Sequence, residues 1–131
     1  MRNPPLILVV DDEPQLLEIM SAKLRAAGFD PVVAHNAHEA VDAAHKILPD
    51  LILMDIKMPD ASGTDAALEI KQDPTTKDLK IAFLSNLKDP WPSTSGNREA
   101  LTKALGMEDY LDKTGDLNAM VAKVREILAR K

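Results

Sequence analysis

Short hydrophobic runs alternate along the chain with longer segments in which hydrophobic residues recur every three or four positions. A run of four or five apolar residues bounded by proline or a charge is typical of a strand buried on both faces of a sheet. Recurrence every three or four residues indicates a helix with one apolar face. The predicted strands are residues 6–10, 31–35, 51–54, 81–84 and 109–111.

Capping and terminating residues predict where the helices between these strands begin and end. Proline suits the first helical turn, while Asn, Ser and Asp side chains cap helix N-termini, and Gly or Pro ends a helix. The predicted limits are Pro14 and Gly28, Asn36 and Pro49, Ser62 (in a capping box with Asp65) and Lys71, Glu99 and Gly106, and Asp116 at the start of the last helix. The second helix is expected to bury a stripe that ends with Ile47 and Leu48.

Five strand–helix repeats predict an α/β fold, a parallel five-stranded sheet with helices on both faces. The length of 131 residues suits one domain. We see no linker, so we expect a single domain over residues 1–131, with a core of about 6–128 and no effector domain in this chain.

The composition limits the classes of partner. The chain has 21 acidic and 16 basic side chains, a net charge of −5, and no cysteine. An acidic surface repels phosphates, so direct nucleic-acid binding is not expected. No hydrophobic run reaches membrane-spanning length and the N-terminus does not resemble a signal peptide, so we expect a cytoplasmic protein without membrane contact.

Polar residues follow four of the five predicted strands. They are Asp11 and Asp12, Asp55, Ser85, and Lys113. The carboxyl ends of parallel strands lie at one edge of the sheet, and ligands of open α/β sheets bind at that edge. Carboxylates about 5 Å apart repel by roughly 3 kcal/mol at an effective dielectric near 20, and a hard cation such as Mg²⁺ relieves that repulsion. A nucleophile, a metal, a lysine and a hydroxyl donor are the parts that phosphoryl transfer needs.

This combination resembles the response-regulator receiver family of two-component signalling. The resemblance rests on Asp11-Asp12, Asp55, Ser85 and the Tyr110–Lys113 segment, and it covers about residues 6–128. It implies the flavodoxin-like strand order 2-1-3-4-5. The family also implies a signalling domain rather than a turnover enzyme.

The resemblance further implies roles for individual residues. Asp55 would be the phosphoacceptor and, with Asp12, a direct ligand of Mg²⁺. Asp11 would hold the ion through water, and Lys57 through its backbone carbonyl.

Four further residues would respond to the phosphoryl group. Lys113 would pair with it, Ser85 would hydrogen-bond to it, and Asn86 would be a further phosphoryl-binding residue. Tyr110 would turn inward as a switch, and the surface around the fourth helix, the fifth strand and the fifth helix would change. The donor would be a phosphohistidine on a histidine kinase or phosphotransfer protein, and the output partner a downstream protein or effector, or a second copy in a homodimer.

Two positions depart from the family pattern. Thr114 follows Lys113, where the family usually has a cis proline, and a cis bond before threonine costs about 2.5–4 kcal/mol, so we expect trans. Asn86 is bulkier than the small residue usual there, and its bulk narrows access to the phosphoryl group.

Three other functions compete with this interpretation. A Mg²⁺-dependent phosphatase of the haloacid-dehalogenase type would carry a second acid two residues after its nucleophile, but Lys57 stands there. A nucleotide or flavin binder would need a glycine-rich loop, which is absent after the first strand. A receiver-like interaction module with little or no phosphorylation remains open because of Asn86 and Thr114. The long loop 87–97 contains Trp91, which is a candidate partner contact or a core-covering residue.

Overall fold

The structure is a computed structural model that describes residues 2–85, 107–112 and 115–130. The predicted helix 99–105 and four residues discussed above, Asn86, Trp91, Lys113 and Thr114, lie outside the described residues. The strands are β1 (Leu6–Val10), β2 (Asp30–Ala34), β3 (Leu51–Asp55), β4 (Ile81–Ser85) and β5 (Asp109–Asp112). The described helices are α1 (Pro14–Ala26), α2 (Ala37–Ile47), α3 (Gly63–Gln72) and α5 (Leu117–Ala129).

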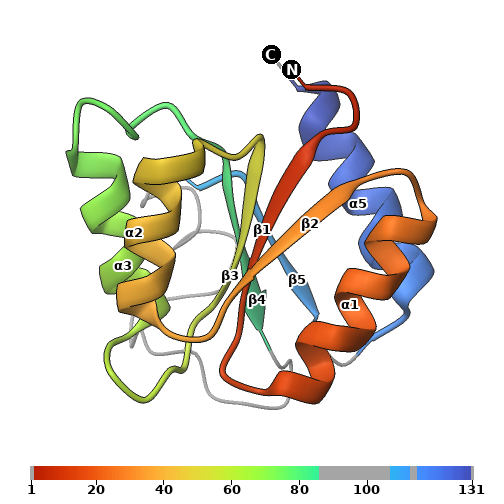
Figure 1. The fold of residues 1–131 in the computed structure, drawn as a ribbon, viewed down its shortest axis with the longest axis horizontal. Helices are drawn as coiled ribbons and strands as arrows, with labels where there is room; N and C mark the ends of the chain where they lie inside the picture. Colours follow the sequence, from red (N-terminus) through yellow and green to blue (C-terminus); the bar gives the residue numbers. More distant parts are fainter. Residues whose placement is uncertain (1, 86–106, 113–114, 131) are drawn as a thin grey trace.

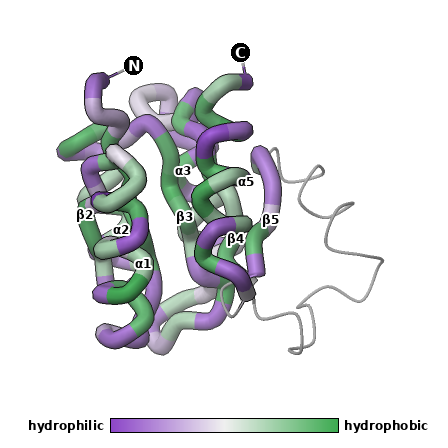
Figure 2. Tube along the Cα trace, turned by 90° about the vertical axis from the view of Figure 1, so that its right-hand side faces the viewer, coloured by the Kyte–Doolittle hydropathy of each residue, from purple (hydrophilic) through white to green (hydrophobic). Residues whose placement is uncertain are grey.

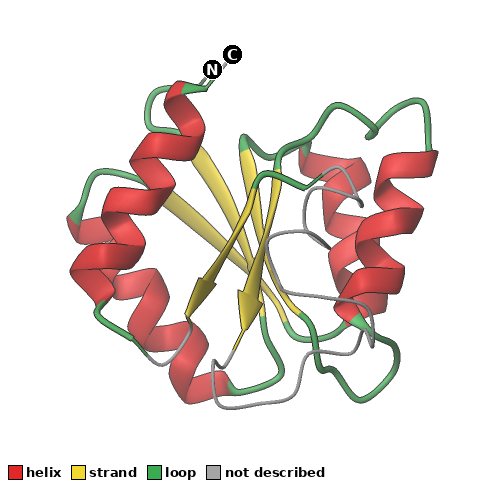
Figure 3. Cartoon of the chain, turned by 180° about the vertical axis from the view of Figure 1, so that it is seen from behind, coloured by secondary structure: helices red, strands yellow, loops and turns green. Residues whose placement is uncertain are grey.

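The five strands form one parallel sheet in the order β2-β1-β3-β4-β5. This confirms the predicted α/β class and the flavodoxin-like order. Because all strands run the same way, their carboxyl ends meet at one edge of the sheet (Figure 3). That edge collects the residues that follow each strand, which is the condition for a shared site.

Helices cover both faces of the sheet, α1 and α5 on one side and α2 and α3 on the other (Figure 1). Successive residues of a strand point to opposite faces, so Ile7 and Val9 pack with α1 and α5, whereas Leu8 and Val10 pack with α2 and α3. Figure 2 shows hydrophobic positions concentrated in the strands between these layers. The buried runs that predicted the strands therefore form the centre of a three-layer structure.

Most predicted helix caps are present. Asn36 Oδ1 accepts the Glu39 N–H at 2.8 Å, and Asp116 Oδ1 accepts the Asn118 N–H at 2.8 Å. Ser62 also caps its helix, but its hydroxyl accepts the Thr64 N–H at 3.2 Å, one residue earlier than in the predicted capping box.

Two details of the prediction were wrong. β2 begins and ends one residue earlier than expected, because Asp30 already pairs with Leu6 of β1. Leu48 does not belong to the buried stripe of α2: it follows the helix with a left-handed φ of 45° and is 43% exposed. The left-handed cap turns the chain away from the helix axis.

The longest described helices, α1 and α5, have 13 residues each. A membrane-spanning helix needs about 20. Within the described ranges, no helix has the length and apolar character to cross a membrane.

Candidate functional site

Three carboxylates converge at the carboxyl edge of the sheet. Asp11 directly follows β1 and Asp55 is the last residue of β3, and these two strands are hydrogen-bonded neighbours. One carboxylate oxygen from each of Asp11, Asp12 and Asp55 lies within 4.8 Å of the other two. The adjacency of β1 and β3 thus brings Asp55 beside two acids that precede it by 44 and 43 residues in the sequence.

The cluster is buried at its base and open on one side. Asp11 and Asp55 are 0% and 2% exposed, whereas Asp12 is exposed. Asp11 Oδ1 accepts the Glu13 N–H at 3.0 Å, and the Asp11 N–H donates to the Ala34 carbonyl at 3.2 Å. The acid after β1 is therefore fixed both to the start of α1 and to the end of β2.

Gly63 allows the loop after β3 to close against Asp55. The Gly63 N–H donates to the Ile56 carbonyl at 2.7 Å. A Cβ at Gly63 would lie 1.9 Å from the Asp55 carbonyl oxygen and 2.9 Å from Ile56 Cα, so only glycine fits there. This role of Gly63 was not predicted from the sequence; the available signal was a glycine, a poor helix former, in the first turn of a capped helix.

Asp60, at the far side of the same loop, binds the beginning of α2. Its two carboxylate oxygens accept the N–H groups of Ala37 and His38, each at 3.0 Å. These donors lower the pKa of Asp60 below its ordinary value of 3.8, because they stabilise the ionised carboxylate. Asp60 was not singled out from the sequence, which carries no sign that the loop meets α2.

The other predicted site residues are placed only in part. Lys57 lies in the loop after β3 and is exposed. Ser85 ends β4, next to the strand that carries Asp55, and it pairs in register with Asp112. Tyr110 is half-buried on β5 and packs against the core cluster under α2 and α3.

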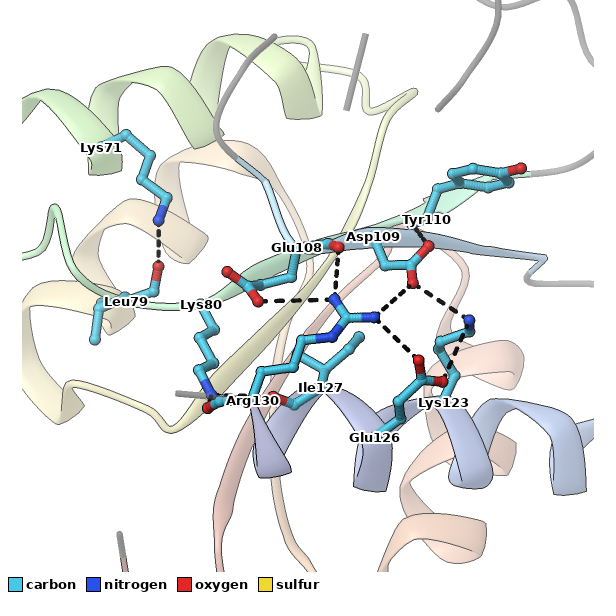
Figure 4. Close-up of polar contacts among 10 residues, drawn as sticks. All are labelled: Lys71, Leu79, Lys80, Glu108, Asp109, Tyr110, Lys123, Glu126, Ile127 and Arg130. Carbon is cyan, nitrogen blue, oxygen red and sulfur yellow. Dashed lines mark hydrogen bonds and ion pairs between the residues drawn. The ribbon is translucent and has the colours of Figure 1, made fainter. Parts of the chain in front are cut away.

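Ion pairs fasten the beginning of β5 to the end of α5 (Figure 4). The Arg130 guanidinium donates to the Glu108 carbonyl at 2.8 Å and lies 3.3 Å from the Asp109 carboxylate. Lys123 Nζ lies 3.3 Å from the same carboxylate. The Tyr110 ring points away from this network (Figure 4). The ion pairs therefore fasten β5 to α5 without using the Tyr110 ring.

The chemistry of the converging side chains fits a hard divalent cation. Three carboxylates supply only oxygen, the donor that Mg²⁺ prefers, and Mg²⁺ typically uses few protein carboxylates together with water and a phosphate oxygen. The exposed side at Asp12 leaves room for such ligands. The arrangement can therefore hold Mg²⁺ beside the buried carboxylate of Asp55.

Comparison with known proteins finds response regulators that match almost the whole chain. The family model described as "Response regulator receiver domain" matches residues 7–125. The DNA-binding dual master transcriptional regulator RpaA of Synechocystis sp. is 30% identical over 126 residues, which are 96% of this chain and 50% of RpaA. The chain spans about half the length of the curated relatives it matches.

Solved structures with the same fold include two informative cases. The response regulator protein TrrA of Thermotoga maritima, in complex with Mg²⁺-BeF, is 31% identical and has a TM-score of 0.77, covering 94% of this chain and 98% of TrrA. The chemotaxis protein CheY4 of Vibrio cholerae is 24% identical with a TM-score of 0.81, covering 94% of this chain and 98% of that one. The likeness to CheY4 concerns the fold alone.

Proposed function

This chain belongs to the response regulator receiver family, and from that premise we propose that it is a signalling domain that accepts a phosphoryl group on Asp55. One observation carries the assignment to this residue. Asp55 is a buried carboxylate at the end of a central strand, with oxygens of two further acids within 4.8 Å. The Mg²⁺-BeF complex of the relative TrrA supports the same chemistry here.

The proposed reaction is a transfer between a nitrogen and a carboxylate oxygen. A carboxylate oxygen of Asp55 attacks phosphorus of a phosphohistidine, the P–N bond breaks, and its electron pair returns to the imidazole, which then takes a proton. The product is an aspartyl phosphate. Asp12, Asp55 and the Lys57 carbonyl would hold Mg²⁺ directly and Asp11 would hold it through water, and the bound ion would neutralise charge on the phosphoryl oxygens.

Residues in β4 and β5, or directly after them in the sequence, complete the proposal. Lys113 pairs with the phosphoryl group, while Ser85 donates a hydrogen bond to it, with Asn86 beside it. Tyr110 then turns inward, and the surface of β5 and α5 changes for the output partner. The domain is not a turnover enzyme, since one phosphoryl group is held as the signal.

The partners follow from the same assignment. We propose that residues 1–131 act as one receiver domain in the cytoplasm, phosphorylated by a histidine kinase or phosphotransfer protein. RpaA is named as DNA-binding, but this chain covers half of it. With a net charge of −5, the domain itself is expected to act on a protein target, an effector domain or a second copy rather than on DNA.

The direct test detects a covalent phosphoryl adduct by its mass. Incubation with Mg²⁺ and a small phosphodonor should add about 80 Da, one phosphoryl group, in a hydroxylamine-sensitive linkage. Asp55→Asn should abolish the adduct while retaining the circular dichroism of the folded domain. Asp65→Asn, an exposed acid on α3, serves as the control and should still be labelled. An adduct of undiminished yield in Asp55→Asn would refute the assignment.

The switch has its own test. With Mg²⁺ and beryllofluoride as a phosphoryl mimic, amide chemical shifts should change along β5 and α5 as well as near Asp55, because a ligand shifts the population toward the state that it binds better. Ser85→Ala should reduce the distant changes and leave those near Asp55. Changes restricted to the carboxylate cluster in the unaltered chain would argue for an inert module.

A further inference from the structure

The N-terminus of α2 is capped from two places. Asn36 provides the ordinary cap from its own segment by accepting the Glu39 N–H at 2.8 Å. The two preceding helical N–H groups, of Ala37 and His38, instead donate to Asp60, which lies in the loop between β3 and α3. Asp60, in the loop that follows the proposed phosphoacceptor Asp55, thus places a negative charge at the positive end of α2, a helix from a different part of the chain.

The loop that contains Asp60 is held at two points. Its base is closed by the Gly63 N–H on the Ile56 carbonyl, at 2.7 Å. Its far side is held by the two bonds from α2 to Asp60. Lys57, whose backbone carbonyl is the proposed fourth ligand of the cation, lies between these two points. The position of that carbonyl therefore depends on both attachments.

A second connection leads from α2 toward the acids. The Asp11 N–H donates to the Ala34 carbonyl, at the end of β2 and three residues before α2. The segment from Ala34 to His38 is consequently bonded both to the acid after β1 and to the loop after β3. It bridges the two segments that supply the carboxylates.

We propose that Asp60 is a positioning residue for the cation, fixing the loop backbone at Lys57 by binding the first turn of α2. The inference rests on the proposed function, since it concerns the affinity of the same metal site. Coupling of this kind is reciprocal. Asp60 raises the affinity for Mg²⁺, and bound Mg²⁺ slows the opening of the bonds from Ala37 and His38.

The test measures Mg²⁺ binding alone, by isothermal calorimetry on the full chain without any phosphodonor. Asp60→Ala removes both bonds, and its dissociation constant should rise at least about fivefold, the lower end of typical coupling between sites. Asp60→Asn keeps one acceptor oxygen and should give an intermediate value. Met58 and Ala61 still pack on the core, so the loop retains apolar attachments in both variants.

Two controls separate positioning from general effects. Asn36→Ala weakens the same end of α2 without touching the loop. Asp65→Ala removes an equal charge from the same surface groove between α2 and α3, with no bond to α2 among those described. Both controls should bind Mg²⁺ within about twofold of the unaltered chain. In the unaltered chain, Mg²⁺ should slow hydrogen exchange of the Ala37 and His38 amides, and in Asn36→Ala it should still do so.

The possible failures are distinguishable. Unchanged Mg²⁺ affinity in Asp60→Ala, or an equal loss in Asn36→Ala or Asp65→Ala, would overturn the positioning role while leaving the proposed function intact. Absence of Mg²⁺ binding to the unaltered chain would overturn the metal site itself.

Discussion

At the scale of single residues, the backbone of Gly63 packs against the backbone of Asp55. Gly63 lies so near the Asp55 carbonyl that a Cβ there would stand 1.9 Å from that oxygen, well inside any non-bonded contact. Gly28, by contrast, has a left-handed φ of 94° but open space where a Cβ would stand. The two glycines are required for different reasons, one for space and one for backbone conformation.

Alanine substitutions should separate these two requirements. Gly28→Ala should cost about 1–2 kcal/mol of unfolding free energy, the penalty for a left-handed residue with a side chain. Gly63→Ala should cost about 3 kcal/mol or more, because backbone atoms of Asp55 and Ile56 must move. Urea unfolding of both variants measures the difference. A Gly63→Ala variant no less stable than Gly28→Ala would contradict the steric argument.

At the scale of elements, α2 and α3 are joined near their C-terminal ends by a histidine. His45 Nε2 lies 2.9 Å from Asp73 Oδ2, and His45 Nδ1 lies 2.9 Å from the Val41 carbonyl. Both ring nitrogens face acceptors, so the doubly protonated ring satisfies both bonds. The hydrogen bond to Asp73, then that to Val41, raises the pKa of His45 above its ordinary value of 6.5, and the charge of Glu69 acts the same way.

The sign of the resulting pH dependence follows from that raised pKa. A group with a higher pKa when folded stabilises the fold fully below its unfolded pKa, and this contribution is lost as the pH rises through the folded pKa. The urea midpoint of the unaltered chain should therefore fall as the pH rises above about 6.5, the ordinary pKa of the ring, and through the raised pKa of the folded state. Asp73 remains ionised throughout, since its own pKa is lowered by His45.

Removing either partner should reduce this dependence. His45→Gln and Asp73→Asn should each flatten the urea midpoint over the same pH range, and the double variant should be no flatter than the single ones, because one interaction is removed in all three. If His45→Gln keeps the full pH dependence, another group is responsible for it.

At the scale of the whole molecule, the parallel sheet places three acids at one edge while its helices cover both faces. The apolar strands stabilise this arrangement, whereas the gathered carboxylates oppose it through mutual repulsion. A cation that binds only the folded chain stabilises it by mass action, by about 2.7 kcal/mol at a concentration 100 times the dissociation constant.

Millimolar Mg²⁺ should accordingly raise the melting temperature, by roughly 5–10 °C if it reaches that saturation. Asp12→Ala should remove most of this rise. Without Mg²⁺, the same variant should melt no lower than the unaltered chain, because Asp12 is exposed and its removal relieves repulsion. Scanning calorimetry of the unaltered chain and of Asp12→Ala, each in EDTA and in Mg²⁺, measures the four melting temperatures. An equal Mg²⁺ response in both proteins would exclude Asp12 from the site.

The sequence by itself determined the described elements, apart from shifts at their ends, and the edge at which the acids gather. Short, continuous apolar runs such as 6–10 and 51–54 are typical of strands buried on both faces of a sheet. Their alternation with helices predicts a parallel sheet with helices on its faces. Asp11, Asp12 and Asp55 follow strands directly, so their convergence needed only the adjacency of β1 and β3. Local patterns sufficed because each concerns residues within one element or its end.

Only the tertiary structure decided which loops meet. The bonds from Asp60 to α2 and from His45 to Asp73 join residues 22 to 28 positions apart, and no periodicity encodes such a contact. The requirement for glycine at position 63 depends on where the Asp55 carbonyl lies in space. The end of α2 at Ile47, before Leu48, likewise depends on how the chain turns to reach β3. These features arise because the packing of whole elements brings groups that are distant in the sequence within bonding distance.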